Sequence, residues 1–197
     1  MKYDFDRIID RTGIPSMKWD AVKDTPDVLP LWVADMDFQS PQPVIDALKE
    51  RVDHEVFGYP GIPDSYYKAV TDWMKRRHGW GIKSEWICPV PGVVPALNRL
   101  VHGFTEPGST VMIQTPVYPP FYGVVTDNGR TLRTNSLICE NNTWSIDWDD
   151  LEEGLAQSET EMFILCSPHN PVGRVCTKAE LVRMCELFLK YYVLMLS

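Results

Sequence analysis

The chain has 197 residues, of which 44% are hydrophobic and 23% charged, so it is long enough to enclose one sizeable hydrophobic core and part of a second. Its formal net charge of −8 argues against nucleic acid or an anionic membrane surface as a partner. The sequence begins without the apolar segment of a secretory signal and contains no apolar run long enough to span a bilayer, so we expect a cytoplasmic protein.

The first fifty residues are rich in proline and irregular, and we expect residues 1–50 to form an arm and a segment of a small domain. A short helix is predicted over residues 41–52, because Pro43 lies near its first turn and basic residues lie near its end. A second helix is predicted over residues 64–79, where apolar side chains recur on one stripe and Gly79 is the expected end.

Strands and helices then alternate along the rest of the chain. Asp147 is the expected N-cap of one helix, and Thr177 with Glu180 has the spacing of a capping box at the start of another. This alternation predicts parallel pairing, right-handed crossovers and a three-layer α/β/α sandwich. The predicted strands cover 85–90, 109–116, 130–138, 161–168 and 192–197, and the predicted helices cover 92–104, 119–129, 145–156 and 177–192.

The cysteines give no sign of redox or metal chemistry. They include no Cys-x-x-Cys pair, and no histidine is placed to act as a base or as a second kind of metal ligand. We therefore expect reduced, buried thiols and no metal site. The five cysteines are Cys88, Cys139, Cys166, Cys176 and Cys185.

Three loops leave the predicted carboxyl ends of strands, where open α/β sheets bind their ligands. The first runs through Gly92 directly into a helix, so its free amides and the helix dipole suit a phosphate group. Glycine at such a turn can also be purely steric. The loop lacks the Walker A pattern and the Gly-x-Gly-x-x-Gly pattern, so nucleotide motifs do not support phosphate binding.

The other two loops carry an aromatic ring and a carboxamide. Tyr118 lies among prolines, where its ring could stack on a flat ligand or pack against those prolines. In the third loop, Ser-Pro and Asn-Pro steps follow a buried strand and predict a rigid turn that presents Asn170. His169 beside it is expected to be a solvated loop residue.

Six motifs in the same order resemble the fold-type I pyridoxal-phosphate (PLP) enzymes of the class I/II aminotransferase superfamily, and in particular the MalY/PatB-type cystathionine β-lyases. The resemblance extends over all 197 residues and implies an aspartate aminotransferase-like fold. Its motifs are "YDFDRIIDRTGIPSMKWD", "LPLWVADMDF", "VFGYP", "PGVVPAL", "TPVYPPFY" and "CSPHNPVGRV".

The resemblance implies a role for each of the three loops. Gly92, Val93 and Val94 match the turn whose backbone amides hold the PLP phosphate. Tyr118 matches the aromatic residue that stacks on the pyridine ring. Asn170 matches the asparagine that hydrogen-bonds the phenolic oxygen of the cofactor and helps to orient the substrate carboxylate.

The resemblance also implies roles for the N-terminal part. Tyr59 matches a tyrosine that reaches the phosphate in the neighbouring subunit, so a homodimer with shared sites is expected. Ala34 and Asp35 match the segment that lines the pocket for an amino-acid substrate. In the family, the peptide bonds that precede the prolines matching Pro116 and Pro171 are often cis.

The family pattern continues past the residues present here. The aspartate that pairs with the pyridine nitrogen and the lysine that forms the Schiff base both match positions beyond Ser197, so no catalytic residue is assigned. Residues 51–197 are then expected to be the first part of a large PLP-binding domain, in a truncated family member. The chain alone is expected to be inactive and to hold PLP non-covalently at most.

Three functions remain open from the sequence. The first is the N-terminal part of a PLP-dependent C–S β-lyase, which converts cystathionine or cysteine to pyruvate, ammonia and a thiol. The second is a PLP-dependent aminotransferase. The third is a non-catalytic protein of half length that binds a phosphate ligand or a partner.

Overall fold

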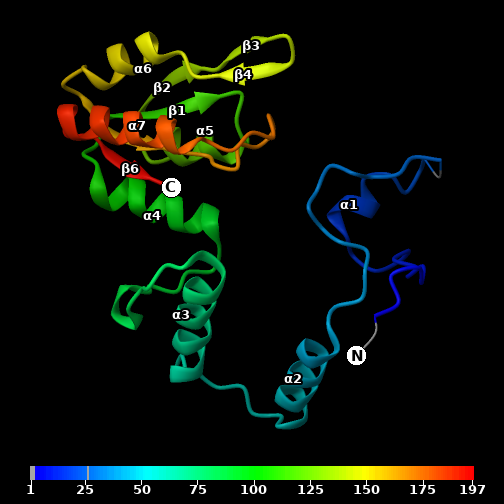
Figure 1. Ribbon diagram of the computed structural model, residues 1–197. Coiled ribbons are helices and arrows are strands. Elements are labelled where there is room, and N and C mark those ends of the chain that lie inside the picture. Colours follow the sequence, from blue (N-terminus) through cyan, green and yellow to red (C-terminus); the bar gives the residue numbers. More distant parts are fainter. Residues whose placement is uncertain (1–2, 26) are drawn as a thin grey trace. The chain divides into compact units, whose positions relative to one another are not determined.

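The computed structural model describes residues 3–25 and 27–197 (Figure 1). The chain forms two compact units, Met1–Ser84 and Glu85–Ser197, and each is described by itself. The expected boundary at residue 50 concerns the domains of the family fold, and it stays a prediction.

The first unit contains three helices joined by irregular segments. They are α1 (Met17–Asp20), α2 (Gln42–Asp53) and α3 (Asp64–His78). The predicted helices over 41–52 and 64–79 are confirmed by α2 and α3. Gly79 ends α3 with a left-handed backbone, φ 64°, whose N–H bonds the carbonyl oxygen of Lys75.

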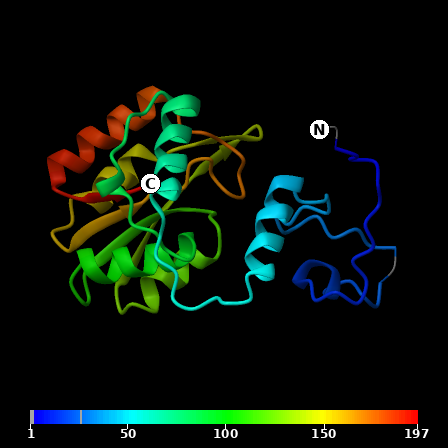
Figure 2. The same ribbon diagram turned by 90° about the horizontal axis from the view of Figure 1, so that it is seen from below.

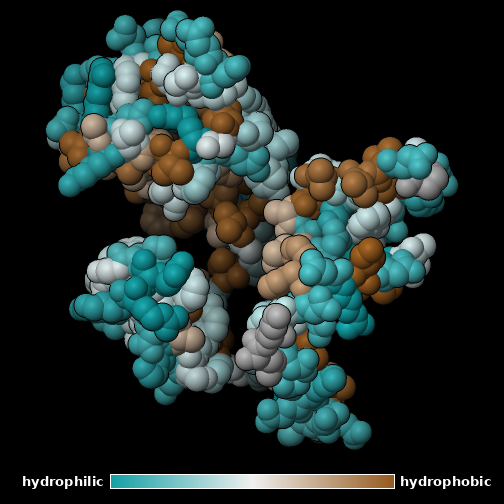
Figure 3. Space-filling view, turned by 45° about the vertical axis from the view of Figure 1, so that its right-hand side comes forward, coloured by the Kyte–Doolittle hydropathy of each residue, from teal (hydrophilic) through white to brown (hydrophobic). Residues whose placement is uncertain are grey.

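The predicted apolar stripe of α3 is not buried. Neither α2 nor α3 has a buried residue, and Tyr66 and Trp73 on that stripe are exposed. Hydrophobic side chains accordingly gather at the surface, where they are brown in Figure 3. The helices α2 and α3 therefore depend chiefly on hydrogen bonds within their own backbone, because neither has a side-chain cap at its start.

The second unit follows the predicted alternation closely. Its helices are α4 (Val93–Phe104), α5 (Pro120–Thr126), α6 (Trp148–Leu155) and α7 (Lys178–Tyr191), and its strands are β1 (Thr110–Thr115), β2 (Thr131–Ser136), β3 (Ile138–Glu140), β4 (Thr143–Ser145), β5 (Thr160–Ile164) and β6 (Leu194–Leu196). The Asp147 N-cap and the capping box of Thr177 and Glu180 are both present.

Four parallel strands form the main sheet in the order β2-β1-β5-β6. The predicted strand over 85–90 is wrong, since a short 3-10 turn (η1, Ser84–Trp86) is followed by irregular chain. Pro89 lacks the N–H that a sheet ladder needs, which explains this difference. The antiparallel β3–β4 hairpin was not predicted.

Helices cover both faces of the main sheet (Figures 1 and 2). Val111 and Ile113 of β1 pack on one face with residues of α4 and α5, and Met112 packs on the other face with residues of α6 and α7. All three side chains are fully buried. The predicted three-layer α/β/α sandwich is therefore confirmed, and the alternation of side chains along β1 explains how one strand supports two cores.

The expectation of buried cysteines is largely wrong. Only Cys176 is buried, Cys166 is half-buried, and the remaining three are exposed and free. Apolar or strand-like neighbours in the sequence did not imply burial, since Cys139, for example, is exposed on the β3–β4 hairpin. Among the described residues, no helix combines the length and the apolar character that a membrane crossing requires.

Candidate functional site

The carboxyl ends of the parallel strands lie at one edge of the main sheet. Ile113 of β1 pairs with Ile164 of β5, which in turn pairs with Leu196 of β6. The twelve residues of α4 span about 18 Å and lead into β1, whose six residues span about 20 Å in the return direction. The N-terminus of α4 therefore lies near the same edge, as Figure 1 shows.

The turn into α4 is suited to an anion. Gly92 is the N-cap with φ 156° and ψ 168°, a conformation that is almost restricted to glycine. No side chain caps this end of the helix, and Pro95 in its first turn has no N–H. The amides of Val93 and Val94 are thus the donors that the first turn offers to a ligand.

Tyr118 lies in the loop between β1 and α5. The residue is 40% exposed, and its ring meets the buried Phe121 in an edge contact, with the ring centroids 6.3 Å apart. The carbonyl oxygen of Tyr118 accepts a hydrogen bond from the Phe121 N–H at 3.0 Å. The core thus supports one edge of the Tyr118 ring, while the exposed part remains accessible to a flat ligand.

Asn170 lies in the loop between β5 and α7. Its side chain is exposed and, within the described part of the chain, has no hydrogen-bonding partner, whereas its backbone N–H bonds the Sγ of Cys166 at 3.4 Å. The peptide bonds preceding Pro116 and Pro171 are cis, as expected, and the bond preceding Pro168 is also cis. The loop therefore presents an unpaired carboxamide on an ordered backbone.

His169 differs from its prediction as a solvated loop residue. It is only 3% exposed, and its Nε2 lies 2.9 Å from the carbonyl oxygen of Pro116. Sequence reasoning missed this residue because its partner is 53 positions away. A histidine placed between two prolines at the ligand edge of the sheet was the signal that could have identified it.

The predicted site residues of the first unit have other contacts. The Asp35 carboxylate pairs with Arg11 at 2.9 Å, and its carbonyl oxygen accepts a hydrogen bond from Lys18 Nζ. The hydrogen bond from Arg11 lowers the pKa of the Asp35 carboxyl, against an opposing effect of burial. Ala34 is exposed, and Tyr59 is fully exposed.

The same ion pairs fix the segment around Asp35. Asp37 accepts hydrogen bonds from Lys18 Nζ at 2.7 Å, from the Trp19 indole at 2.8 Å and from Arg11 at 2.7 Å. These bonds, that from Lys18 first, hold the pKa of the Asp37 carboxyl well below its usual range. Lys18 itself is only 3% exposed, so the network joins two N-terminal segments around a buried cation.

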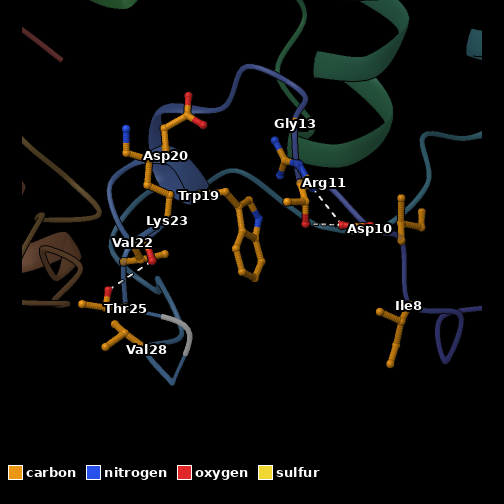
Figure 4. Close-up of a pocket in the computed structure, with 12 residues that line it drawn as sticks. Ile8, Asp10, Arg11, Gly13, Trp19, Asp20, Val22, Lys23, Thr25 and Val28 are labelled. Carbon is orange, nitrogen blue, oxygen red and sulfur yellow. Dashed lines mark hydrogen bonds between the residues drawn. The ribbon is translucent and has the colours of Figure 1, made fainter.

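A hollow of about 470 Å³ opens beside this network, and Figure 4 shows Trp19 within it. Its lining is mainly apolar and includes Ile8, Ile9, Val22 and Val28. A second hollow, of about 510 Å³, lies between α7 and β6, and its lining includes Phe188, Tyr192 and Leu194. Neither of these two hollows includes Gly92, Tyr118 or Asn170.

The predicted ligand residues of the second unit offer three different kinds of contact. Two backbone amides at a helix N-terminus suit a phosphate, an exposed tyrosine ring suits an aromatic ring, and a carboxamide suits a phenolic oxygen. All three groups belong to the second unit. A phosphorylated pyridine such as PLP has these features together.

Comparison with known families gives one match, to the model described as aminotransferase class I and II, over residues 26–197. Cystathionine β-lyase PatB of Bacillus subtilis is 46% identical over 98% of the chain, which covers 51% of that protein. The chain therefore spans about half the length of the curated relatives it matches.

Two solved structures are similar over nearly the whole chain. Cystalysin from Treponema denticola, which contains a PLP cofactor, superposes with a TM-score of 0.92 at 40% identity. The match covers 99% of this chain and 51% of the cystalysin chain. A PLP-bound putative aminotransferase from Clostridium difficile 630 superposes with a TM-score of 0.91 at 43% identity. This match covers 98% of this chain and 51% of the aminotransferase chain.

Proposed function

Because the chain belongs to the aminotransferase class I and II family, we propose that it is the N-terminal part of a PLP-dependent C–S β-lyase. The proposal is supported by the placement of the Gly92 turn at the start of α4, of Tyr118 after β1 and of the unpaired Asn170 carboxamide after β5, because α4 leads into β1 and both loops follow carboxyl ends of the main sheet. The similarity to PatB supports cystathionine or a related thioether amino acid as the substrate.

Each group of the proposed site has its own role. The amides of Val93 and Val94 bind the phosphate, with help from the α4 dipole. Tyr118 stacks on the pyridine ring, and Asn170 donates a hydrogen bond to the phenolic oxygen and orients the substrate carboxylate. When bound, PLP supplies an electron sink for the electrons released at the substrate Cα.

Three residues of the first unit have roles that the family resemblance implies, and we propose these roles here. Ala34 and Asp35 would line the substrate pocket, with Asp35 held in place by Arg11. Tyr59 would reach the phosphate of the partner subunit in a homodimer, a role that is compatible with its full exposure. We also propose that residues 1–197 do not include the family's Schiff-base lysine and therefore hold PLP non-covalently at most.

An aminotransferase is the second candidate. It is favoured by the similarity to the putative aminotransferase of Clostridium difficile 630 and by the description of the family model. It would use the same phosphate turn, ring-stacking tyrosine and carboxamide. The two reactions differ in the fate of the substrate sulfur, because only the lyase breaks the bond between Cβ and sulfur.

Binding experiments on residues 1–197 test the cofactor site. We expect saturable binding of PLP in equilibrium dialysis, competition by inorganic phosphate, and about tenfold weaker binding of pyridoxal, which lacks the phosphate. Equal affinities for PLP and pyridoxal, or no PLP binding, would contradict the proposed site.

The reaction is tested on a protein that extends over the full length of its relatives. With cystathionine as substrate, a lyase releases pyruvate and a free thiol in equal amounts, whereas an aminotransferase needs a keto-acid acceptor and releases no thiol. Thiol release without an added keto acid would favour the lyase. Acceptor-dependent turnover without thiol would favour the aminotransferase.

A further inference from the structure

His169 is almost completely buried, although it lies in a loop between two prolines. Its Nε2 is 2.9 Å from the backbone oxygen of Pro116. Because a carbonyl oxygen can only accept a hydrogen bond, the Nε2 atom must carry the proton and donate it. This bond joins the loop after β5 to the loop after β1.

The backbone of His169 forms two hydrogen bonds within its own loop. Its N–H donates to the carbonyl oxygen of Arg174 at 2.7 Å, and its carbonyl oxygen accepts from the N–H of Gly173, also at 2.7 Å. The next residue, Asn170, donates its N–H to the Sγ of Cys166. The position of Asn170 is thus coupled to that of the His169 ring through a compact, hydrogen-bonded turn.

The acceptor side is equally well fixed. Pro116 follows the last residue of β1, and Val117 next to it is buried in the core. Tyr118 comes directly afterwards, with its ring against Phe121. A bond to the oxygen of Pro116 therefore fixes the Asn170 loop relative to a loop that is itself attached to the core.

We propose that His169 is a positioning residue that holds Asn170 at a set distance from Tyr118, and so aligns the carboxamide with a ring stacked on the tyrosine. The inference rests on the proposed function, because it assigns to His169 the geometry of the PLP site. His169 acts through the two loops and does not touch the ligand. The phosphate turn at Gly92 lies outside this connection.

Variants of His169 separate the hydrogen bond from the packing. H169Q places an amide N–H close to the position of Nε2, H169L fills the space without a donor, and H169N is polar but too short to reach Pro116. We expect PLP to bind about tenfold more weakly to H169L and H169N, because each leaves the oxygen of Pro116 unpaired, and within about threefold of the unsubstituted chain to H169Q.

Inorganic phosphate supplies a control within the same protein. Because the phosphate turn does not depend on His169, its affinity for inorganic phosphate should stay within about twofold in all three variants. A general loss of structure would weaken phosphate and PLP binding together. H169N guards against the case in which H169L fails to fold.

Hydrogen exchange gives a readout that needs no cofactor. In H169L and H169N, peptides covering residues 116–121 and 169–174 should exchange faster than in the unsubstituted chain, whereas peptides from α6 should not change. H169Q should keep the slower exchange. This comparison decides whether the bond between the two loops orders them even when no ligand is added.

The outcomes separate the two proposals. Unchanged PLP affinity in H169L and H169N, or an equal loss in H169Q, would overturn the role of His169. If the unsubstituted chain binds no PLP, the proposed cofactor site fails, and exchange rates alone then test whether His169 joins the loops. Equal exchange in all four proteins would overturn that connection as well.

Discussion

The guanidinium group of Arg130 is hydrogen-bonded to the C-terminal end of α4, where its Nε donates to the Oγ1 of Thr105 at 2.9 Å. It also donates to the carbonyl oxygens of His102, Thr105 and Asn128, and Arg130 is only 7% exposed. The cation thus lies at the negative end of the helix dipole. The opposite end of the same helix is the Gly92 turn, so Arg130 anchors the helix that would bind the phosphate.

Replacement of Arg130 should destabilise the second unit strongly. R130M fills much of the same space but leaves several buried carbonyl oxygens of the α4 end unpaired, so we expect a loss of about 3 kcal/mol in the free energy of unfolding. Urea unfolding measures this loss. R130K keeps the charge without the planar fork of donors and should lose about half as much. A loss below about 1 kcal/mol in R130M would contradict the anchoring role.

The Glu180 carboxylate should make the stability of α7 depend on pH. Burial raises its pKa, but hydrogen bonds from the Thr177 N–H, the Arg174 side chain and the Thr177 hydroxyl outweigh burial, so the net pKa is lowered from its usual 4.5. A carboxyl whose pKa is lower in the folded state contributes stability above its unfolded pKa. That contribution is lost as the pH falls through the folded pKa.

The comparison of E180Q with the unsubstituted chain isolates this contribution. The difference in unfolding free energy should be constant between about pH 7 and pH 5 and should shrink as the pH falls below about 4.5. Urea titrations at several pH values provide the measurement. E186Q, at an exposed position of the same helix, controls for the loss of a surface charge. A difference that persists unchanged at about pH 3 would contradict the lowered pKa.

The sequence predicted the features that depend on neighbouring residues. The order of strands and helices in the second unit followed from periodicity, and the start of α7 followed from the spacing of Thr177 and Glu180. The β3–β4 hairpin also had a local signal that was missed. Asn141 and Asn142 have φ 50° and 59°, as two-residue hairpin turns require.

Features that depend on distant partners could not be predicted in this way. Burial of His169 depends on Pro116, and the pairing of Asp35 with Arg11 joins positions 24 residues apart. Each of these contacts arises only when the chain brings two segments together. The roles of Gly92, Tyr118 and Asn170 in ligand binding stay predictions, although all three lie on the unit that forms the sheet.

Alanine at position 92 should damage the phosphate turn through its backbone. A Cβ added to Gly92 would meet only Pro95 Cδ, at an ordinary 3.6 Å, so there is room for the side chain. The backbone with φ 156° is nevertheless unfavourable for alanine, and we expect G92A to lose about 1–3 kcal/mol of stability. Its affinity for inorganic phosphate should fall about tenfold, because the relaxed turn no longer directs the amides of Val93 and Val94 toward the phosphate.

Gly103 in the same helix provides a matched control. A Cβ there would meet nothing within 4 Å, and its backbone is helical. G103A should therefore be neutral or should stabilise the protein by about 0.5–1 kcal/mol, with unchanged phosphate affinity. Equal effects of G92A and G103A on phosphate binding would show that the turn conformation is not the determinant.

Loss of the Tyr118 ring should weaken PLP binding but should change the stability of the protein only slightly. Y118F keeps the ring and should bind PLP within about twofold of the unsubstituted chain, whereas Y118A should bind about tenfold more weakly because the stacking surface is lost. Since Tyr118 is 40% exposed, Y118A should cost only about 1 kcal/mol of stability. Y122A removes a tyrosine of similar exposure, 37%, from α5 and should leave PLP affinity unchanged. If Y122A weakens PLP binding as much as Y118A does, the ring of Tyr118 is not the stacking surface, and the predicted site at the sheet edge is wrong.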